Sequence, residues 1–340
     1  MPALRYRMRG GAGLTDDLST FIRDDLFVTV PEMGIFSTDV NIKCEGLTLG
    51  GSIKFKTAVA MIEDLESRGV LSAAAGGRPQ EIIESSSGNL GVALSLVCAG
   101  KGIAFTCVTD PNIAASNLAL MKAIGANVVV ITRRDDNGGF LASRINYIRS
   151  RLEKEPHLVW TNQYANEACK LAHKRWTCPA IRRAFPKVDY LFVGAGSTGT
   201  LMGCCEYFRE NCADTQVVGV DSIGSVTFFG VAHSRYIPGI GTSRRPELFN
   251  ADLPHLLVQI PEADTVRMCR EMRDRVGLLL GGSTGTVLAA VKKLKEKIPA
   301  DAVVVALSPD LGERYADTIY DDSWVAKTFP AHFDAAVSTA

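Results

Sequence analysis

Short apolar runs alternate with helix-length amphipathic segments along most of the chain. The runs lie at 103–109 (IAFTCVT), 127–131 (NVVVI), 190–194 (YLFVG), 216–221 (QVVGVD) and 302–307 (AVVVAL). Between them, apolar residues at helical spacing predict helices over 57–69, 88–102 and 116–126. Alternating strands and helices pack as a parallel sheet with helices on both faces. We therefore expect an α/β fold whose ligands bind at the carboxyl ends of the strands.

The length of 340 residues is enough for two moderate domains. We place a boundary near residue 150, which gives an N-terminal domain of residues 1–150 and a C-terminal domain of residues 151–340. In this division, about the first forty residues can pack against the C-terminal domain instead of the N-terminal one. The polar stretch 133–139 predicts an exposed loop, and 182–189 predicts a linker into a new strand.

Composition narrows the class of partner and the cellular compartment. The chain has 37 basic residues (Lys and Arg) and 37 acidic residues (Asp and Glu). Its net charge therefore does not favour binding to nucleic acid or to an anionic membrane. The nine cysteines are scattered and form no CxxC pair, so we expect neither a disulfide framework nor a metal site. The N-terminus lacks the apolar core of a signal peptide, and no apolar run is long enough to span a bilayer. These features predict a cytoplasmic protein with small-molecule ligands.

The segment GAGSTG at 194–199 follows an apolar run, and Asp221 ends the next run. This is a literal GxGxxG, the pattern of a dinucleotide site. The physics of such a turn is more general, since glycines let backbone amides approach any anion at a helix N-terminus. The turn is therefore compatible with NAD, with pyridoxal phosphate or another phosphate, or with a purely structural role. Thr198 and Thr200 favour a monophosphate, because hydroxyls beside the amides complete a compact cup.

Two further glycine-rich turns precede predicted helices. ESSSGNLG at 84–91 places serines and Gly88 before a helix, where free amides and hydroxyls suit a carboxylate. An ordinary helix cap explains the same residues without a ligand, since serine and asparagine are preferred capping residues. LLLGGSTGT at 278–286 again joins an apolar run to a helical stretch.

A lysine stands at the start of the helix predicted over 57–69, in GGSIKFK at 50–56. Most lysines are solvated surface groups. Two glycines precede Lys54 closely, and Ile53 and Phe55 flank it. These neighbours favour a closely packed position for its amine. Desolvation there lowers the pKa of the amine, as Schiff-base chemistry requires.

In this order, GGSIK, SSSGNLG, GAGSTGT and LLLGGSTGT resemble the cysteine synthase and cystathionine β-synthase family of pyridoxal-phosphate enzymes, from about Gly50 to Asp322. The resemblance implies fold type II, an α/β fold like that of the tryptophan synthase β subunit, with two domains and parallel-rich twisted sheets flanked by helices. It also implies a homodimer and pyridoxal 5′-phosphate as cofactor.

The resemblance assigns roles to individual residues. Lys54 would hold the cofactor as a Schiff base, and Asn89 would hydrogen-bond its 3′ oxygen. The phosphate would lie against the turn of Ser197, Thr198, Gly199 and Thr200. The substrate carboxylate would bind Ser86, Ser87, Gly88 and Gln163. Ser283 would face the pyridine nitrogen, where a hydroxyl does not force protonation and so favours β-elimination over transamination.

Four segments resemble one branch of the family, whose enzymes join L-glutamate to a seryl unit on the way to 2,3-diaminopropionate, a precursor of siderophores and peptide antibiotics. They are TNQYANE (161–167), VGVDSIGSV (218–226), IPGIGTSRRPE (237–247) and PDLGERYADTIYDDSWV (309–325). The expected reaction is β-replacement on O-phospho-L-serine by the amine of L-glutamate, with Lys54 as general base. Arg244 is a candidate for binding the donor phosphate or the acceptor carboxylates, because a guanidinium binds oxyanions in a fork.

The chain also departs from the family pattern. Thr48 and Leu49 replace the usual Asn-Pro before the double glycine, and Phe55 and Lys56 replace the usual Asp-Arg after the lysine. The sequence of the predicted phosphate turn resembles that of cysteine synthases in general more than that of this branch.

Four other functions remain open at this point. A cysteine synthase that uses sulfide with O-acetylserine or O-phosphoserine shares every cofactor residue. A serine or threonine dehydratase normally has a phosphate turn richer in glycine. An NAD-dependent dehydrogenase would use GAGSTG and Asp221 but leaves Lys54 without a role. A catalytically silent family member would bind the cofactor and act only as a binding partner.

Overall fold

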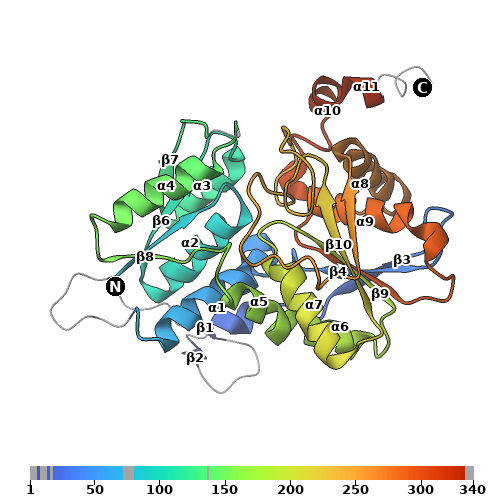
Figure 1. Ribbon diagram of the computed structural model, residues 1–340, viewed down its shortest axis with the longest axis horizontal. Coiled ribbons are helices and arrows are strands. Elements are labelled where there is room, and N and C mark those ends of the chain that lie inside the picture. The colour runs from blue at the N-terminus through green and yellow to red at the C-terminus, as the bar shows by residue number, and fades with distance from the viewer. Residues whose placement is uncertain (1–5, 8–13, 16–17, 72–79, 136–137, 334–340) are drawn as a thin grey trace.

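The computed structural model describes residues 6–7, 14–15, 18–71, 80–135 and 138–333. The described strands form sheets of four and six strands, together with an antiparallel pair of β1 (Tyr6–Arg7) and β2 (Leu14–Thr15). Figure 1 shows the two larger sheets side by side, each accompanied by its own helices, with α1 and α5 below and between them.

The four-stranded sheet is parallel throughout, in the order β7–β6–β5–β8. Its strands are β5 (Glu81–Ser85), β6 (Ala104–Thr109), β7 (Asn127–Val130) and β8 (Leu158–Trp160). The helices that connect them are α2 (Asn89–Lys101), α3 (Ala115–Ile124) and α4 (Leu141–Leu152). The first two end at Gly102 and Gly125, whose left-handed backbones end a helix at little cost.

The six-stranded sheet has the order β11–β10–β9–β12–β4–β3, and only the edge strand β3 is antiparallel. Its strands are β3 (Phe27–Val30), β4 (Val40–Cys44), β9 (Tyr190–Gly194), β10 (Gln216–Ser222), β11 (Leu256–Ile260) and β12 (Val304–Ser308). Central strands of such a sheet are covered on both faces and are apolar throughout. In β9, Phe192 packs beneath α8 and α9, while Leu191 and Val193 pack beneath α6 and α7.

The remaining helical segments surround these sheets. They are α1 (Lys54–Ser67), α5 (Ala168–Ala172), the π-helical turn η3 (His173–Thr177), α6 (Cys178–Ala184), α7 (Gly199–Asn211), α8 (Glu262–Val276), α9 (Gly282–Lys293), α10 (Asp322–Thr328) and α11 (Pro330–Phe333), with short 3-10 segments η1 (Leu18–Phe21), η2 (Leu49–Gly51), η4 (Lys295–Lys297) and η5 (Gly312–Tyr315). None of the helices in the described part of the chain has the length and apolar character to cross a membrane.

The expected α/β architecture with parallel-rich sheets is confirmed. All five apolar runs become strands, and the helix predicted over 57–69 begins three residues earlier, at Lys54. The expected linker 182–189 is shorter than predicted, because α6 continues to Ala184. The division into domains near residue 150 stays a prediction. The structure places β3 and β4 in the six-stranded sheet, and β8 in the four-stranded one.

Candidate active site

The amine of Lys54 lies at the first residue of α1, 3.2 Å from the hydroxyl oxygen of Ser197. Burial lowers the pKa of this ammonium, while nearby Cys169 and Glu84 raise it by less than burial lowers it. A lowered pKa increases the neutral fraction of the amine, which is the form that attacks a carbonyl carbon. The hydrogen bond to Ser197 also shows that the predicted lysine and the predicted phosphate turn are in direct contact.

The turn between β9 and α7 has the features of an anion site. Thr198 has a left-handed backbone with φ of 67°, and the turn leads into the N-terminus of the 13-residue helix α7. The Thr198 hydroxyl is buried and has no hydrogen-bond partner among the described residues. A Cβ on Gly199 would lie 2.7 Å from that of Cys169, so only glycine fits there. A buried hydroxyl without a partner at a helix N-terminus is suited to a phosphate oxygen.

The fourth predicted residue of this turn, Thr200, forms a hydrogen bond with a buried histidine. Its hydroxyl lies 3.1 Å from Nε2 of His173, and Nδ1 of that ring lies 3.0 Å from the Thr177 hydroxyl. Burial and the ammonium groups of Lys56 and Lys54 hold the pKa of His173 well below its usual range. The ring is therefore neutral and can link the two hydroxyls.

The departure at Lys56 has a structural explanation. Its ammonium lies 2.8 Å from Glu45 and donates to the Thr177 hydroxyl at 3.3 Å, with the whole group buried. Phe55 packs in the core beside α2. The Lys56 ammonium therefore pairs with Glu45, whereas the Lys54 amine donates to Ser197.

The second glycine-rich turn joins β5 to α2. The Ser86 hydroxyl accepts hydrogen bonds from the amides of Gly88 and Gly91, at 3.3 and 3.0 Å. Ser86 therefore satisfies one free amide in the first turn of α2, whose N-cap residue is Gly88. Ser87, Gly88 and Asn89 are half-buried.

Gln163 lies against the same turn. Its side-chain amide donates to the Ser85 carbonyl at 3.0 Å, and its backbone amide donates to Glu84 at 3.1 Å. Glu84 is buried and also accepts hydrogen bonds from Thr161 and Trp160 at the end of β8. One carboxyl group thus connects the two loops that carry the predicted carboxylate-binding residues.

The third turn leads into α9 and places Ser283 in a buried position. Close by, a Cβ on Gly281 would lie 1.9 Å from Oδ1 of Asp310, and the other oxygen of this carboxyl group accepts from Asn89 at 2.7 Å. The turn before α9 and the start of α2 therefore meet at Asp310.

Arg244 is less available than its sequence position suggested, since its guanidinium forms an ion pair with Glu247 on the same loop. Sequence analysis missed Arg144, which is buried and lies 3.4 Å from Asp110. Its Nη1 forms this ion pair, while its buried Nε has no hydrogen-bond partner among the described residues. The signal was an arginine on the apolar face of a helix, beside Ile145 and Ile148. Buried guanidinium donors without partners point to an oxyanion.

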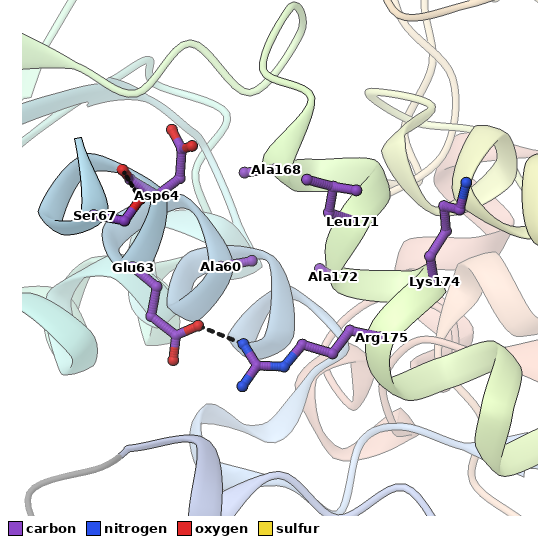
Figure 2. A pocket seen from close by; sticks show the side chains of 9 residues that line it. All are labelled: Ala60, Glu63, Asp64, Ser67, Ala168, Leu171, Ala172, Lys174 and Arg175. Atoms are coloured by element: carbon purple, nitrogen blue, oxygen red, sulfur yellow. Dashed lines mark hydrogen bonds and ion pairs between the residues drawn. The ribbon is translucent and has the colours of Figure 1, made fainter.

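A groove elsewhere on the molecule is not part of this site. It has a cavity volume of about 570 Å³ and lies between α1 and the segment of α5 and η3. Figure 2 shows Glu63 of α1 paired with Arg175 of η3, and Ala60, Ala168 and Ala172 also line the groove. None of the predicted site residues lines it.

The pyridoxal-phosphate dependent enzyme family matches residues 19–310 of the chain. The chain belongs to this family. It is 38% identical over 303 residues to an N-(2-amino-2-carboxyethyl)-L-glutamate synthase of Ralstonia nicotianae, covering 89% of this chain and 88% of that one. An enzyme of the same name from Cupriavidus metallidurans is 36% identical over 298 residues, 86% of each chain. The predicted family, cofactor and enzyme class are confirmed.

Two solved structures of the same fold agree with this assignment. A hydrogen sulfide-producing enzyme from Fusobacterium nucleatum superposes with a TM-score of 0.81 at 25% identity, over 89% of this chain and all of that one. A mutant O-ureido-L-serine synthase with bound O-ureido-L-serine gives a TM-score of 0.81 at 25% identity, over 93% and 98% of the two chains. The residues of the phosphate turn fit the cofactor's phosphate, because the unpartnered Thr198 hydroxyl lies at the N-terminus of α7.

The NAD interpretation of the GAGSTG turn is wrong, because the family that matches the chain depends on pyridoxal phosphate. Asp221, which would have to bind a ribose, is buried and accepts from the Ser222 amide at 2.8 Å. Gly241 and Arg235 cover it, since a Cβ on Gly241 would lie 3.1 Å from Asp221 Oδ1 and 2.5 Å from the Arg235 guanidinium. The carboxyl group therefore lies buried beside Gly241 and Arg235, and its Oδ2 has no hydrogen-bond partner among the described residues.

Replacing Thr198 by Val tests the phosphate turn, because the change removes a hydroxyl and keeps the shape. We expect the Kd of pyridoxal phosphate to rise about 10- to 100-fold, the usual value of a hydrogen bond to a charged group. The cofactor-free protein should lose no stability, since the hydroxyl has no partner there. Equilibrium dialysis and urea unfolding measure the two quantities.

Thr215→Val is the matched control. The Thr215 hydroxyl is buried and donates to the Val188 carbonyl at 2.8 Å, remote from the turn. This variant should lose about 1 kcal/mol of stability and bind the cofactor normally. Unchanged cofactor affinity in Thr198→Val would contradict the assignment of the phosphate to this turn.

Proposed function

We propose that this enzyme joins the amine of L-glutamate to the β-carbon of O-phospho-L-serine and releases N-(2-amino-2-carboxyethyl)-L-glutamate. The observation that carries the proposal is the similarity to two synthases of that name along nearly nine tenths of their length. The buried Arg144 supports it, because both substrates bring more than one anionic group.

Pyridoxal phosphate, when bound, withdraws electrons from the α-carbon of an attached amino acid, so that the α-proton becomes acidic and a β-substituent can leave. The turn Ser197–Thr200 would hold its phosphate, Ser283 would face its pyridine nitrogen and Asn89 its 3′ oxygen. The buried position of Ser283 supports this arrangement, since a hydroxyl leaves the nitrogen unprotonated and favours elimination.

Lys54 would move the protons. Its amine, with a pKa lowered by burial, removes the α-proton of the donor and later returns one after the new bond forms. The Ser197 hydroxyl, 3.2 Å away, is placed to accept a hydrogen bond from this amine. The donor's carboxylate would bind Ser87, the amides near Gly88 and the Gln163 side chain.

The donor phosphate and the acceptor carboxylates need cationic side chains to bind them. Burial raises the pKa of the Tyr164 hydroxyl, while Arg144 and Arg244 lower it by less, so both guanidinium groups lie within electrostatic reach of this hydroxyl. Arg144 retains a buried donor, Nε, without a partner among the described residues, so we assign it the main role in binding the donor phosphate or the acceptor carboxylates. Arg244 would join it only by exchanging its partner Glu247.

A cysteine synthase is the second candidate, and one observation favours it. The structurally similar Fusobacterium enzyme produces hydrogen sulfide, and the phosphate turn reads like cysteine synthases in general. Sulfide carries no carboxylate, so the two candidates differ in their need for Arg144 if this residue binds the acceptor rather than the donor phosphate.

We also propose a cytoplasmic homodimer that supplies a precursor of 2,3-diaminopropionate for siderophore or antibiotic synthesis. The names of the relatives support the product. The free cysteines, nearly all of them buried, are compatible with a reducing compartment.

The first test is the visible absorbance of the purified enzyme as substrates are added in sequence. We expect O-phospho-L-serine to change the cofactor's band with release of phosphate, and L-glutamate to restore it with formation of the coupled product by mass. Restoration by sulfide but not by L-glutamate would instead establish the cysteine synthase.

Replacing Arg144 by Gln tests the anion site. We expect the KM of O-phospho-L-serine or of L-glutamate to rise at least about tenfold, since hydrogen bonds to charged groups are lost. Phosphate release without acceptor separates the two cases. Arg149→Gln, an exposed position on the same helix, is the control and should change neither constant. An Arg144→Gln enzyme with normal constants would remove this residue from the site.

A further inference from the structure

The side chain of Asn89 uses both of its polar atoms. Its Nδ2 donates to Oδ2 of Asp310 at 2.7 Å, and its Oδ1 accepts from Nη1 of Arg314 at 2.5 Å. The same oxygen of Asp310 also accepts from the Tyr315 hydroxyl at 2.8 Å. Arg314 takes part in none of the binding contacts or proton transfers of the proposed reaction.

Arg314 determines which way the Asn89 amide faces. An asparagine side chain can turn over and exchange its oxygen and nitrogen, but a guanidinium only donates. Oδ1 of Asn89 must therefore face Arg314. Because arginine has no acceptor, this result holds whatever the protonation state of Asp310. One N–H of the amide then faces Asp310, and the second N–H has no partner among the residues that the structure describes.

Arg314 is itself held in place by several contacts. Its Nη2 donates to the Gly50 carbonyl at 2.5 Å, and its Nη1 lies 3.3 Å from Oδ1 of Asn117. A Cβ on Gly51 would lie 2.6 Å from Nη2, so a glycine at this position leaves room for the guanidinium. The side chain comes from η5, after the last strand of the six-stranded sheet, and reaches η2, α2 and α3.

We propose that Arg314 is a positioning residue, which fixes the orientation of the Asn89 amide so that one N–H stays available to the 3′ oxygen of the cofactor. Arg314 does this without touching the cofactor. The inference rests on the proposed function, since it assumes that Asn89 lies against bound pyridoxal phosphate. Without Arg314, the amide can turn its oxygen toward the cofactor instead, which replaces a donor by an acceptor.

A double-mutant cycle of Arg314→Met and Asn89→Ala tests this, with the cofactor Kd and the visible spectrum as measurements. Arg314→Met alone should weaken cofactor binding by up to about tenfold, the usual range for one hydrogen bond, and shift the visible band. In the Asn89→Ala background the same change should have no further effect on either quantity, because Arg314 acts through Asn89.

Two outcomes would overturn the proposal. One is a loss of affinity of equal size with and without Asn89, which indicates a general structural role. The other is an unchanged Kd and spectrum in Arg314→Met. Arg267→Met is the control, since Arg267 is an exposed arginine paired with Asp264 on α8, and it should bind the cofactor normally.

Folding is monitored by circular dichroism of the cofactor-free variants. If Arg314→Met does not fold, the cycle is run with Arg314→Lys, which keeps the charge but not the two-pronged donor. The same lack of additivity is expected. A wild-type protein that binds no cofactor would contradict the proposed function itself, an outcome distinct from a failed cycle.

Discussion

The site depends on the contact between the Lys54 amine and the turn that follows β9. Parallel strands end at one edge of a sheet, and the helices that follow them present free amides there. The turns before α7 and α9 lie at this edge, and α2 begins nearby with Asn89. A lysine whose pKa is lowered by burial is useful only beside such anion-binding turns, because they can hold the group that carries its carbonyl partner.

Buried charge is unusually concentrated behind this contact. Lys43 and Lys56 share the carboxylate of Glu45, and none of the three side chains is exposed. Burial alone would raise the pKa of Glu45, but the two lysines hold it below its usual range. Such a cluster is costly to bury unless every partner is present. Its connection through Thr177 and His173 to Thr200 places it directly behind the phosphate turn.

Much of the fold and part of the site could be predicted from the sequence, because each depends on local patterns. Apolar runs gave the strands, and a glycine-rich turn before a helix has a limited set of uses. Arg144 was missed because its importance depends on how α4 packs beside Asp110. The partners of Asn89 lie 221 and 225 residues away along the chain, at Asp310 and Arg314, and no local pattern joins them. Conversely, Arg244 looked free in the sequence but is paired with Glu247.

The central claim is that Lys54 carries the cofactor. Borohydride reduces a carbon–nitrogen double bond between a lysine and pyridoxal phosphate to a stable single bond, which survives proteolysis and can be located by peptide mass spectrometry. We predict that the label lies on the peptide containing Lys54 and that fragmentation places it on this residue, not on Lys56 two positions later. A label on Lys56 or on any other lysine, or a reduced protein without label, would contradict the account.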